Sequence, residues 1–423
     1  MNFLEELQWR GMIHQMTPGT DALLQDGMIT GYIGFDPTAP SLTIGNYVQI
    51  MLLRLFQDAG HRPIILMGGA TGRIGDPSGK DKERELKSYD ELDHNLEFQS
   101  RQFARFLDFE GPNAAIIVNN LDFYRDMNVL DFLRQVGKTL TVNYMSSKDS
   151  VKKRLETGLS FTEFSYQLLQ AYDFQCLYTQ HDCRLQMGGS DQWGNITSGT
   201  EFIRRNVDGK AHAVTTPLLT KADGSKFGKS ERGNIWLSPE LTSPYQFFQF
   251  WLKADDADLR NYIRYFSLRP REEMQALLDR VDEDPISVKA QLAEELTVRV
   301  HSRAAYESVL SVSELLFNKK ANRDTLLGLD ETSLATVAQE IPSFQIERDQ
   351  LAAGINIVDL LAEHTSIQSS KGEARRSIKG NAIAVNKEKI KDHEYRVDAT
   401  ALLHGKYLMV ENGRKNKFII VTQ

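Results

Sequence analysis

Cysteine, long apolar runs and a targeting segment are what this 423-residue sequence most clearly lacks. Its two cysteines, Cys176 and Cys183, have no partner pair at metal-ligand spacing, so we expect no bound metal and a reducing, cytoplasmic compartment. No segment approaches the roughly 18 consecutive apolar residues of a transmembrane helix. The first residues also lack the basic region and apolar region of a secretory signal. These absences argue against a membrane protein, a secreted protein and a zinc protein.

Charge is unevenly distributed along the chain. The net charge is −7, with 25% charged and 41% hydrophobic residues, which is ordinary for a globular protein. Residues 350–423 hold 12 Lys and Arg against 8 Asp and Glu, a balance of +4, so the rest of the chain carries −11. A basic tail on an acidic body fits a local module for a polyanion, and a solvated basic face fits it equally well.

The first half of the chain alternates short apolar runs with helical patterns. Runs at 30–35, 63–68 and 115–118 are typical of strands. Strands separated by helices predict an α/β fold with a parallel sheet over about 31–216. Ligands of such sheets bind at the loops that leave the carboxyl ends of the strands, so these loops are where we look for a site.

The second half predicts further domains, as the length of the chain also does. The pattern is helical from about 242 to 318, and Pro244 stands in a first turn where its missing N–H costs no hydrogen bond. The polar, weakly periodic range 319–349 predicts a connector. A last module, 350–423, contains a helix-like run at 372–378 and strand-like runs at 382–387 and 417–421.

Two loops carry residue types suited to a nucleoside triphosphate. Residues 34–47 read GFDPTAPSLTIGNY, a strand that turns into a helix start, where free backbone N–H groups suit an anion and Gly45 would let a flat base lie close. Residues 221–230 read KADGSKFGKS, where Lys226 and Lys229 offer flexible ammonium groups to the charge of a leaving pyrophosphate. Taken alone, the first is also compatible with an ordinary capped helix and the second with a solvated turn.

Together and in this order, the two loops resemble the signature pair of class I aminoacyl-tRNA synthetases. The resemblance covers nearly the whole chain, most strongly 31–251 and least 319–349. Three longer runs resemble the bacterial-type tyrosyl-tRNA synthetases in particular: GATGRIGDPSGK (69–80), FTEFSYQLLQAYD (161–173) and QMGGSDQWGN (186–195).

The resemblance implies a Rossmann-like parallel-sheet catalytic domain at 1–216, with an inserted segment at about 122–164 that pairs two subunits and presents the acceptor stem of tRNA. Phe161 is the candidate interface residue of this homodimer. The other implied parts are a mobile loop and linker at 217–243, an α-helical anticodon-side domain at 244–320, a connector at 321–349 and a small α+β RNA-binding domain at 350–423.

A pocket for L-tyrosine is also implied. Tyr32 and Asp173 would hydrogen-bond the phenol of the substrate, while Tyr166, Gln170 and Asp76 would hold its ammonium group. Chemistry agrees independently, because buried polar partners are left unsatisfied when a substrate lacks the hydroxyl. The spacing of Tyr166, Gln170 and Asp173 also fits one polar face of a buried helix without any ligand.

The remaining implied residues serve ATP. Lys226, Lys229 and Ser230 would form the phosphate loop, and Lys80 and Arg84 would add positive charge nearby unless they are ordinary surface charges. The residues expected to contact ATP or the adenylate are Asp36, Thr38, Gly45, Asp191, Gln192, Lys229 and Ser230.

Three departures from the family pattern concern the same regions. Thr43 and Asn46, which we count as catalytic, stand where most members have histidines, so hydrogen-bond donors persist while charge is lost. Ile33 replaces a frequent cysteine beside the phenol-reading tyrosine. Phe227 and Gly228 stand where the generic class I loop has Met-Ser, a variant common among tyrosyl enzymes.

The tail resembles a small RNA-binding domain also found in ribosomal proteins, through the runs SSKGEARRSI (369–378) and AIAVN (382–386). Lys371, Arg375 and Lys379 are spaced by four and would share one helix face aimed at phosphates, unless the helix is merely solvated. RNA rather than DNA as the partner follows from the resemblance alone.

The implied activity is that of a tyrosine–tRNA ligase. Such an enzyme activates L-tyrosine with ATP, which brings Mg²⁺, and transfers the tyrosyl group to the 3'-terminal ribose of tRNA(Tyr). Two rivals remain open. A tryptophanyl-tRNA synthetase shares the fold, but Tyr32 and Asp173 suit a phenol better than an indole. A catalytically inactive RNA-binding relative would explain the missing histidines, but not the intact pocket and loop lysines.

Overall fold

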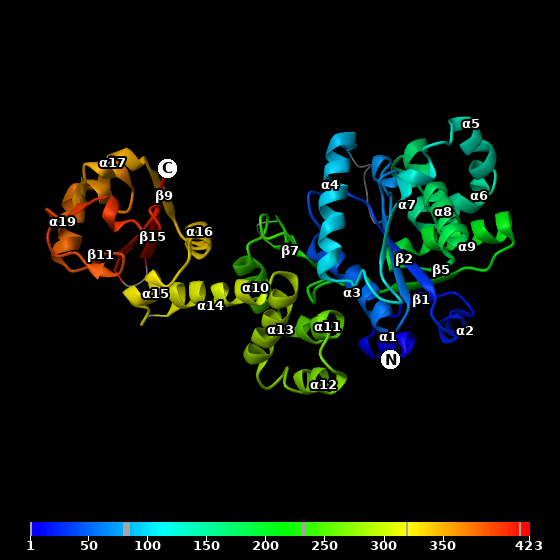
Figure 1. Cartoon of the computed structure of the whole chain (residues 1–423), viewed down its shortest axis with the longest axis horizontal. Coiled ribbons are helices and arrows are strands. Elements are labelled where there is room, and N and C mark those ends of the chain that lie inside the picture. The colour runs from blue at the N-terminus through cyan, green and yellow to red at the C-terminus, as the bar shows by residue number, and fades with distance from the viewer. Residues whose placement is uncertain (1, 79–84, 231–232, 319, 414–415) are drawn as a thin grey trace. The chain divides into compact units, whose positions relative to one another are not determined.

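The computed structural model describes residues 2–78, 85–230, 233–318, 320–413 and 416–423 (Figure 1). They form two compact units, and each is described by itself. The first unit is Met1–Thr242 with Phe250–Val300, and the second is Ser243–Gln249 with His301–Gln423. Within the described ranges, no helix is both long and apolar enough to cross a bilayer.

A six-stranded sheet forms the core of the first unit. Every neighbouring pair of strands is parallel except the pair of β1 and β6. The strand order is β1-β6-β5-β2-β3-β4. The strands are β1 (Gln15–Met16), β2 (Thr30–Phe35), β3 (Arg62–Met67), β4 (Ile116–Asn119), β5 (Cys183–Gly189) and β6 (His212–Thr216).

The order of these strands reverses at β2. The chain adds β3 and β4 on one side of β2 and then returns to add β5 and β6 on the other side. The carboxyl ends of β2 and β5, at Phe35 and Gly189, therefore flank the crevice where an open parallel sheet binds its ligands. The strand runs expected at 30–35, 63–68 and 115–118 are confirmed as β2, β3 and β4.

Helices cover the sheet and continue after it. The helices that precede and follow β5 along the chain, α8 and α9, pack against each other and run close together in Figure 1 (green). The helices around the sheet are α1 (Phe3–Arg10), α2 (Thr20–Gln25), α3 (Ile44–Asp58), α4 (Tyr89–Gln102), α5 (Val129–Phe132), α6 (Val142–Ser146), α7 (Asp149–Thr157), α8 (Phe161–His181) and α9 (Trp193–Val207). Beyond the sheet follow the short hairpin β7 (Lys229–Ser230) and β8 (Gly233–Asn234), then α10 (Pro244–Leu252), α11 (Asp256–Phe266), α12 (Arg271–Asp279) and α13 (Pro285–Val300).

Two arginines, the buried Arg10 and the half-buried Arg299, tie these later helices to α1 and α3. Arg10 pairs with Glu6 at 2.6 Å and donates to the carbonyls of Arg264 and Ser267 at 2.7 and 2.8 Å. Arg299 donates to the carbonyl of Phe266 at 2.6 Å and to the hydroxyl of Tyr47, on α3, at 3.2 Å. The helix that follows the first signature loop is thereby fixed against α11 and α13.

A five-stranded sheet and a cluster of buried apolar residues form the second unit. The strand order is β12-β11-β14-β15-β9, in which only β15 and β9 are parallel. Its helices are α14 (Arg303–Phe317), α15 (Arg323–Leu327), α16 (Glu331–Glu340), α17 (Arg348–Ala352), α18 (Ile357–Asp359) and α19 (Lys371–Lys379). Its strands are β9 (Ser343–Ile346), β10 (Ile355–Asn356), β11 (Ile383–Val385), β12 (Glu388–Lys389), β13 (Arg396–Val397), β14 (Tyr407–Asn412) and β15 (Asn416–Thr422).

The range 321–349, which we expected to be a connector, is folded. It holds α15, α16 and the strand β9, whose main chain pairs with β15. Leu326, Leu334 and Val337 are fully buried. Such short elements bury one or two residues each, and that is too few to produce a periodic pattern in the sequence.

Candidate active site

The first signature loop ends in a capped helix. Thr43 is the N-cap of α3 and forms a reciprocal capping box with Asn46. The Thr43 main-chain N–H and hydroxyl both donate to Asn46 Oδ1, at 2.9 and 2.8 Å, and the Asn46 N–H donates to Thr43 Oγ1 at 3.4 Å. Beside them, Gly45 is exposed, and a Cβ built there would meet only the Thr43 hydroxyl, at 3.4 Å. The surface over the helix start is therefore open to a flat ligand.

The two signature loops meet in space. The segment that follows the second loop pairs with the first, because Ile44 donates its N–H to the carbonyl of Ile235 and Leu237 donates to that of Leu42, both at 2.9 Å. Gly228 lies against α3 so closely that a Cβ there would be 2.8 Å from Ile44 Cγ2 and 3.4 Å from the Gly45 nitrogen. The loop thus adjoins the helix N-terminus that it would serve.

Phe227 anchors this loop on an aromatic cluster. Its ring stacks on Phe266 at 5.4 Å between centroids and lies 5.3 Å from Tyr262. Phe266 in turn stacks on Tyr47 of α3 at 5.5 Å. Lys226 and Lys229, on either side of the anchored segment, keep exposed side chains. The loop expected to be mobile is therefore held at its apolar residue while its cations are free to reach a ligand.

The two residues expected to bind the phenol, Tyr32 and Asp173, lie together in the core. Tyr32, on β2, is fully buried, and its hydroxyl forms no hydrogen bond with any residue that the structure describes. Asp173, on α8, is 1% exposed and accepts from Asn120 Nδ2 at 2.8 Å and from the Tyr124 hydroxyl at 2.7 Å. Burial raises the pKa of Asp173 to about 7; the two hydrogen bonds oppose this rise, and the charge of Asp36 adds to it.

A chain of hydrogen bonds leads from Asp173 to the residues expected around ATP and the ammonium group. Asn120 Nδ2 also donates to the Thr71 hydroxyl at 3.0 Å, and that hydroxyl donates to Asp36 Oδ1 at 2.6 Å. The Tyr166 hydroxyl donates to Asp36 Oδ2 at 2.9 Å. The structure therefore brings Asp36, Tyr166 and Asp173 into one network.

A second network surrounds Asp76. Its carboxylate accepts from Gln192 Nε2 at 2.7 Å, from Asn195 Nδ2 at 3.3 Å and from the Ser78 N–H at 2.9 Å. Burial, and then the charge of Asp76, raise the pKa of Asp191. The two carboxylates therefore act on each other at the carboxyl end of β5.

Five other residues were expected to contact tyrosine or ATP or to lie near them, and the structure describes only some of their side chains. The amide oxygen of Gln170 is buried without a partner among the described residues, as a group awaiting a ligand would be. Thr38 lies in a tight turn whose N–H donates to the Asp36 carbonyl at 2.8 Å. Lys80, Arg84 and the side chain of Ser230 lie outside the described residues.

Sequence reasoning missed Asn120, Thr71, Tyr124 and Asn195. A usable signal existed for Asn120 and Thr71, because they follow β4 and β3 at the carboxyl edge of the sheet. Asn195 ends the run 186–195 whose resemblance marked the region, but the run gave this residue no role. Tyr124 gave no signal, since a tyrosine after a strand has many ordinary uses.

The three cations expected to bind RNA do not share one environment. Lys371 forms ion pairs with Asp359 at 2.8 Å and Glu363 at 2.9 Å. Arg375 and Lys379, later in α19, are exposed. Arg375 and Lys379 are therefore the more accessible of the three to a phosphate.

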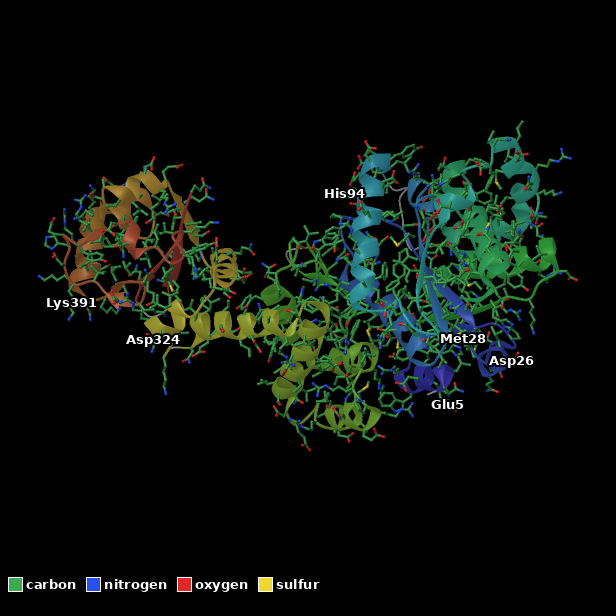
Figure 2. The ribbon with its side chains drawn as sticks, in the orientation of Figure 1. Glu5, Asp26, Met28, His94, Asp324 and Lys391 are labelled. Carbon is green, nitrogen blue, oxygen red and sulfur yellow. The ribbon has the colours of Figure 1, made fainter. Side chains whose placement is uncertain are left out.

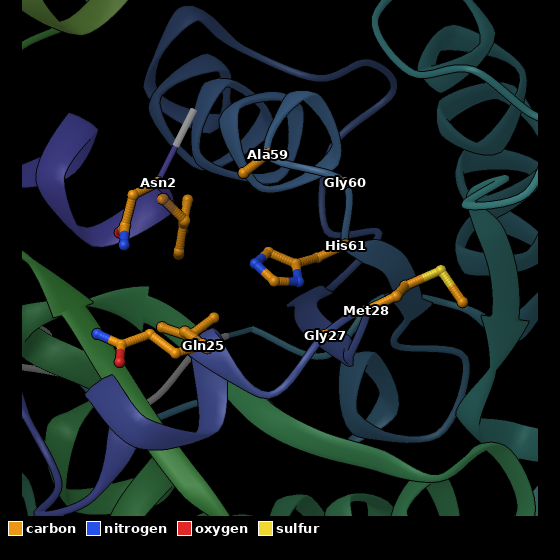
Figure 3. A pocket seen from close by; sticks show the side chains of 9 residues that line it. Asn2, Gln25, Gly27, Met28, Ala59, Gly60 and His61 are labelled. Atoms are coloured by element: carbon orange, nitrogen blue, oxygen red, sulfur yellow. The ribbon is translucent and has the colours of Figure 1, made fainter.

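A surface cavity of about 420 Å³ lies near the amino-terminal ends of β2 and β3 (Figure 3). Its lining includes His61, Gly27 and Met28, which precede β3 and β2, and Met28 is labelled at the surface in Figure 2. Because the expected site residues follow the carboxyl ends of the strands, this cavity is not the expected substrate pocket.

Comparison with known proteins gives consistent matches. Residues 25–318 match the family described as tRNA synthetases class I (W and Y), and residues 333–420 match the tyrosine–tRNA ligase SYY-like C-terminal domain. Tyrosine–tRNA ligases of Porphyromonas gingivalis and Cytophaga hutchinsonii are 53% and 52% identical, over 100% and 99% of both chains. The crystal structure of a C-terminally truncated mitochondrial tyrosyl-tRNA synthetase from Aspergillus nidulans is 29% identical, with a TM-score of 0.67 over 75% of this chain and 94% of that one.

Proposed function

We propose how the candidate site joins tyrosine to tRNA, starting from the fact that the chain belongs to the tyrosine–tRNA ligases among the class I tRNA synthetases. Its activity is the ATP-dependent ligation of tyrosine to tRNA. The tryptophanyl enzyme and the inactive RNA-binding relative are not favoured, because these full-length relatives are all tyrosine–tRNA ligases.

The phenol of the substrate lies between Tyr32 and Asp173. The observation that carries this proposal is the Tyr32 hydroxyl, which is buried and has no hydrogen-bond partner among the described residues. A buried polar group without a partner costs about 1–3 kcal/mol, and a ligand hydroxyl would remove that cost. Asp173, whose charge acts on the Tyr32 hydroxyl, then accepts a hydrogen bond from the phenol hydroxyl of the substrate.

The ammonium group of the substrate lies among Tyr166, Gln170 and Asp76. The unpartnered amide oxygen of Gln170 and the carboxylate of Asp76 are acceptors, which an ammonium group requires. Tyr166 donates its hydroxyl proton to Asp36, and the oxygen of a phenol is also a hydrogen-bond acceptor.

ATP binds with its Mg²⁺ over the start of α3, where Gly45 leaves room for the base. Asp36, Thr38, Asp191 and Gln192 contact the nucleotide at the carboxyl ends of β2 and β5. The phosphates face the helix N-terminus and the loop formed by Lys226, Lys229 and Ser230.

Chemistry proceeds in two steps. A carboxylate oxygen of tyrosine forms a bond to the α-phosphorus of ATP, and the bond from that phosphorus to pyrophosphate breaks. A hydroxyl of the terminal ribose of tRNA then attacks the tyrosyl carbonyl, and AMP leaves. The first nucleophile is already anionic, so alignment and charge stabilisation rather than a general base provide the catalysis.

We expect Asn46 to matter more than Thr43 for adenylate formation. Asn46 Oδ1 is held by Thr43, which leaves its Nδ2 to donate to a phosphate or the ribose. Thr43→Ala removes a cap worth about 1 kcal/mol and should lower the unfolding midpoint more than the rate. Asn46→Ala should slow adenylate formation about tenfold, the equivalent of 1.4 kcal/mol. Single-turnover rates and thermal melts of the two variants test this, and equal rate losses would contradict it.

The second unit binds tRNA through α19, where Arg375 and Lys379 are exposed and Lys371, held by two carboxylates, contributes less. We retain 350–423 as the RNA-binding domain, 217–243 as loop and linker, and 244–320 as the anticodon-side helices.

The proposed location is the cytoplasm. The product, tyrosyl-tRNA, is used in translation, and the two cysteines are free thiols, as in a reducing compartment.

The segment 122–164 pairs two copies of the chain. Exposed apolar side chains support this, since such residues seldom gather on a monomer surface without a partner. We expect light scattering to give twice the mass of one chain, and Phe161→Glu to lower it toward one. Ile286→Glu, on α13, is the matched control, because Ile286 is also an exposed apolar residue. The exposed residues of the segment are Val129 (70%), Leu130 (73%), Leu133 (47%), Val142 (66%) and Phe161 (73%).

Exchange of labelled pyrophosphate into ATP tests the function directly. The enzyme should catalyse this exchange with tyrosine and not with tryptophan. Exchange with tryptophan alone would establish the tryptophanyl rival, and no exchange with either amino acid would leave only the inactive RNA-binding relative.

A further inference from the structure

Tyr124 is a half-buried contact of Asp173 that neither the sequence motifs nor the family pattern pointed out. It follows the short 3-10 helix after β4, and its hydroxyl lies 2.7 Å from Asp173 Oδ1 and 3.0 Å from the Leu169 carbonyl oxygen. Its ring is packed by Tyr172 at 5.7 Å and by Phe132 at 6.4 Å. The hydroxyl therefore has a fixed place beside one oxygen of the carboxylate.

Asp173 depends on such donors because its surroundings disfavour a negative charge. The groups facing it are Tyr32 on β2, Asp36 just after that strand, and Tyr172 and Cys176 on its own helix. These groups are neutral or acidic. Asn120 Nδ2 donates a hydrogen bond to one oxygen of the Asp173 carboxylate, and the Tyr124 hydroxyl donates to the other. Each oxygen can still accept another hydrogen bond.

We propose that Tyr124 is a specificity-determining positioning residue, whose hydroxyl holds the Asp173 carboxylate in place as the acceptor for the phenol of tyrosine. The proposal rests on the tyrosine site described above. It adds that the preference for tyrosine over phenylalanine is set by the pair of Tyr124 and Asp173, and not by Asp173 alone.

A pH dependence follows from this arrangement. Burial raises the pKa of Asp173 to about 7, and the bond from Tyr124 opposes that rise. The ionised carboxylate is the stronger acceptor of a hydrogen bond from the phenol, so tyrosine recognition should weaken as the pH falls through this range. Removal of the Tyr124 hydroxyl raises the pKa of Asp173 further, and the loss should then begin at a higher pH.

The experiment compares Tyr124→Phe with Tyr172→Phe in the full-length enzyme. Tyr172 is the matched control, because it neighbours the same carboxylate while its own hydroxyl bonds to Cys176. Pyrophosphate exchange is measured against tyrosine and phenylalanine from pH 6 to pH 9. For Tyr124→Phe we expect kcat/KM for tyrosine to fall about tenfold at pH 7, mainly through KM, since a hydrogen bond to a charged group is lost. Its acid limb should move to higher pH, while the values for phenylalanine stay constant.

Three results would overturn the proposal. They are an unmoved acid limb with an unchanged ratio of tyrosine to phenylalanine, an equal loss for both amino acids, and an equal shift in Tyr172→Phe. The second result would reveal a merely structural role. Failure of the proposed function is distinguishable, because the unsubstituted enzyme would then show no tyrosine-dependent exchange.

Discussion

Lys229→Ala should slow formation of tyrosyl-adenylate by about 10²–10³-fold, the loss typical of removing one group that stabilises transition-state charge. Lys229 is exposed in the loop whose Gly228 rests against the start of α3. Its ammonium group can therefore follow the charge that moves onto the departing pyrophosphate. Tyrosine affinity should stay nearly constant, because the phenol and ammonium partners belong to other elements.

Two measurements separate these effects. Single-turnover formation of the adenylate gives the rate, and equilibrium binding of tyrosine without ATP gives the affinity. Lys253→Ala is the matched control, because Lys253 is an exposed lysine outside the loop and loses the same charge. An equal loss of rate and affinity in Lys229→Ala, or a similar loss of rate in Lys253→Ala, would contradict the role of Lys229.

The parallel sheet was predictable because strong local signals determine its strands. The apolar runs that became β2 and β3 are mostly buried strands, and the run that became β4 is a partly exposed strand at the edge of the sheet. The rule that ligands gather at carboxyl strand ends then directed attention to Asp36 and to the loop that contains Asp76. What each of these carboxylates binds in the free enzyme depends on residues far away in the sequence, such as Tyr166 and Gln192.

The sequence alone could not give the partners that hold the carboxylate of Asp173. Asn120 and Tyr124 lie 53 and 49 residues from Asp173 along the chain. No periodicity connects them, and only the return of the chain through α8 brings them together. The same limit explains β9, which is a strand because β15, about 70 residues later, offers it a free edge.

Thr43 belongs to the first signature loop and is also the N-cap of α3. By its position in the signature it was a candidate for phosphate contact, yet its hydroxyl is committed to Asn46. Thr and Asn at N-cap and N3 form a capping box, so two residues replace histidines without leaving the helix start uncapped. The main-chain N–H groups of the capped helix start thus remain part of the proposed phosphate site, beside the loop lysines.

Gly228→Ala should slow adenylate formation by about 10–100-fold, the equivalent of about 1.4–2.7 kcal/mol. The residue has a φ of +88°, which costs an L-residue roughly 1–2 kcal/mol, and its new Cβ would lie 2.8 Å from Ile44 Cγ2. Because the Gly45 main chain lies directly behind, at 3.4 Å, the loop rather than α3 has to move. The two lysines would then be displaced from the helix start that holds the phosphates.

Gly224→Ala isolates the cause. Gly224 lies in the same loop with a φ of +80°, but a Cβ there would meet no atom within 4 Å. Both variants carry the same backbone strain, and only Gly228→Ala adds the collision with α3. A rate loss confined to Gly228→Ala would show that contact between the two signature loops is required for catalysis. Equal losses in the two variants would attribute the effect to backbone strain, and the proposed contact would then have no part in positioning the lysines.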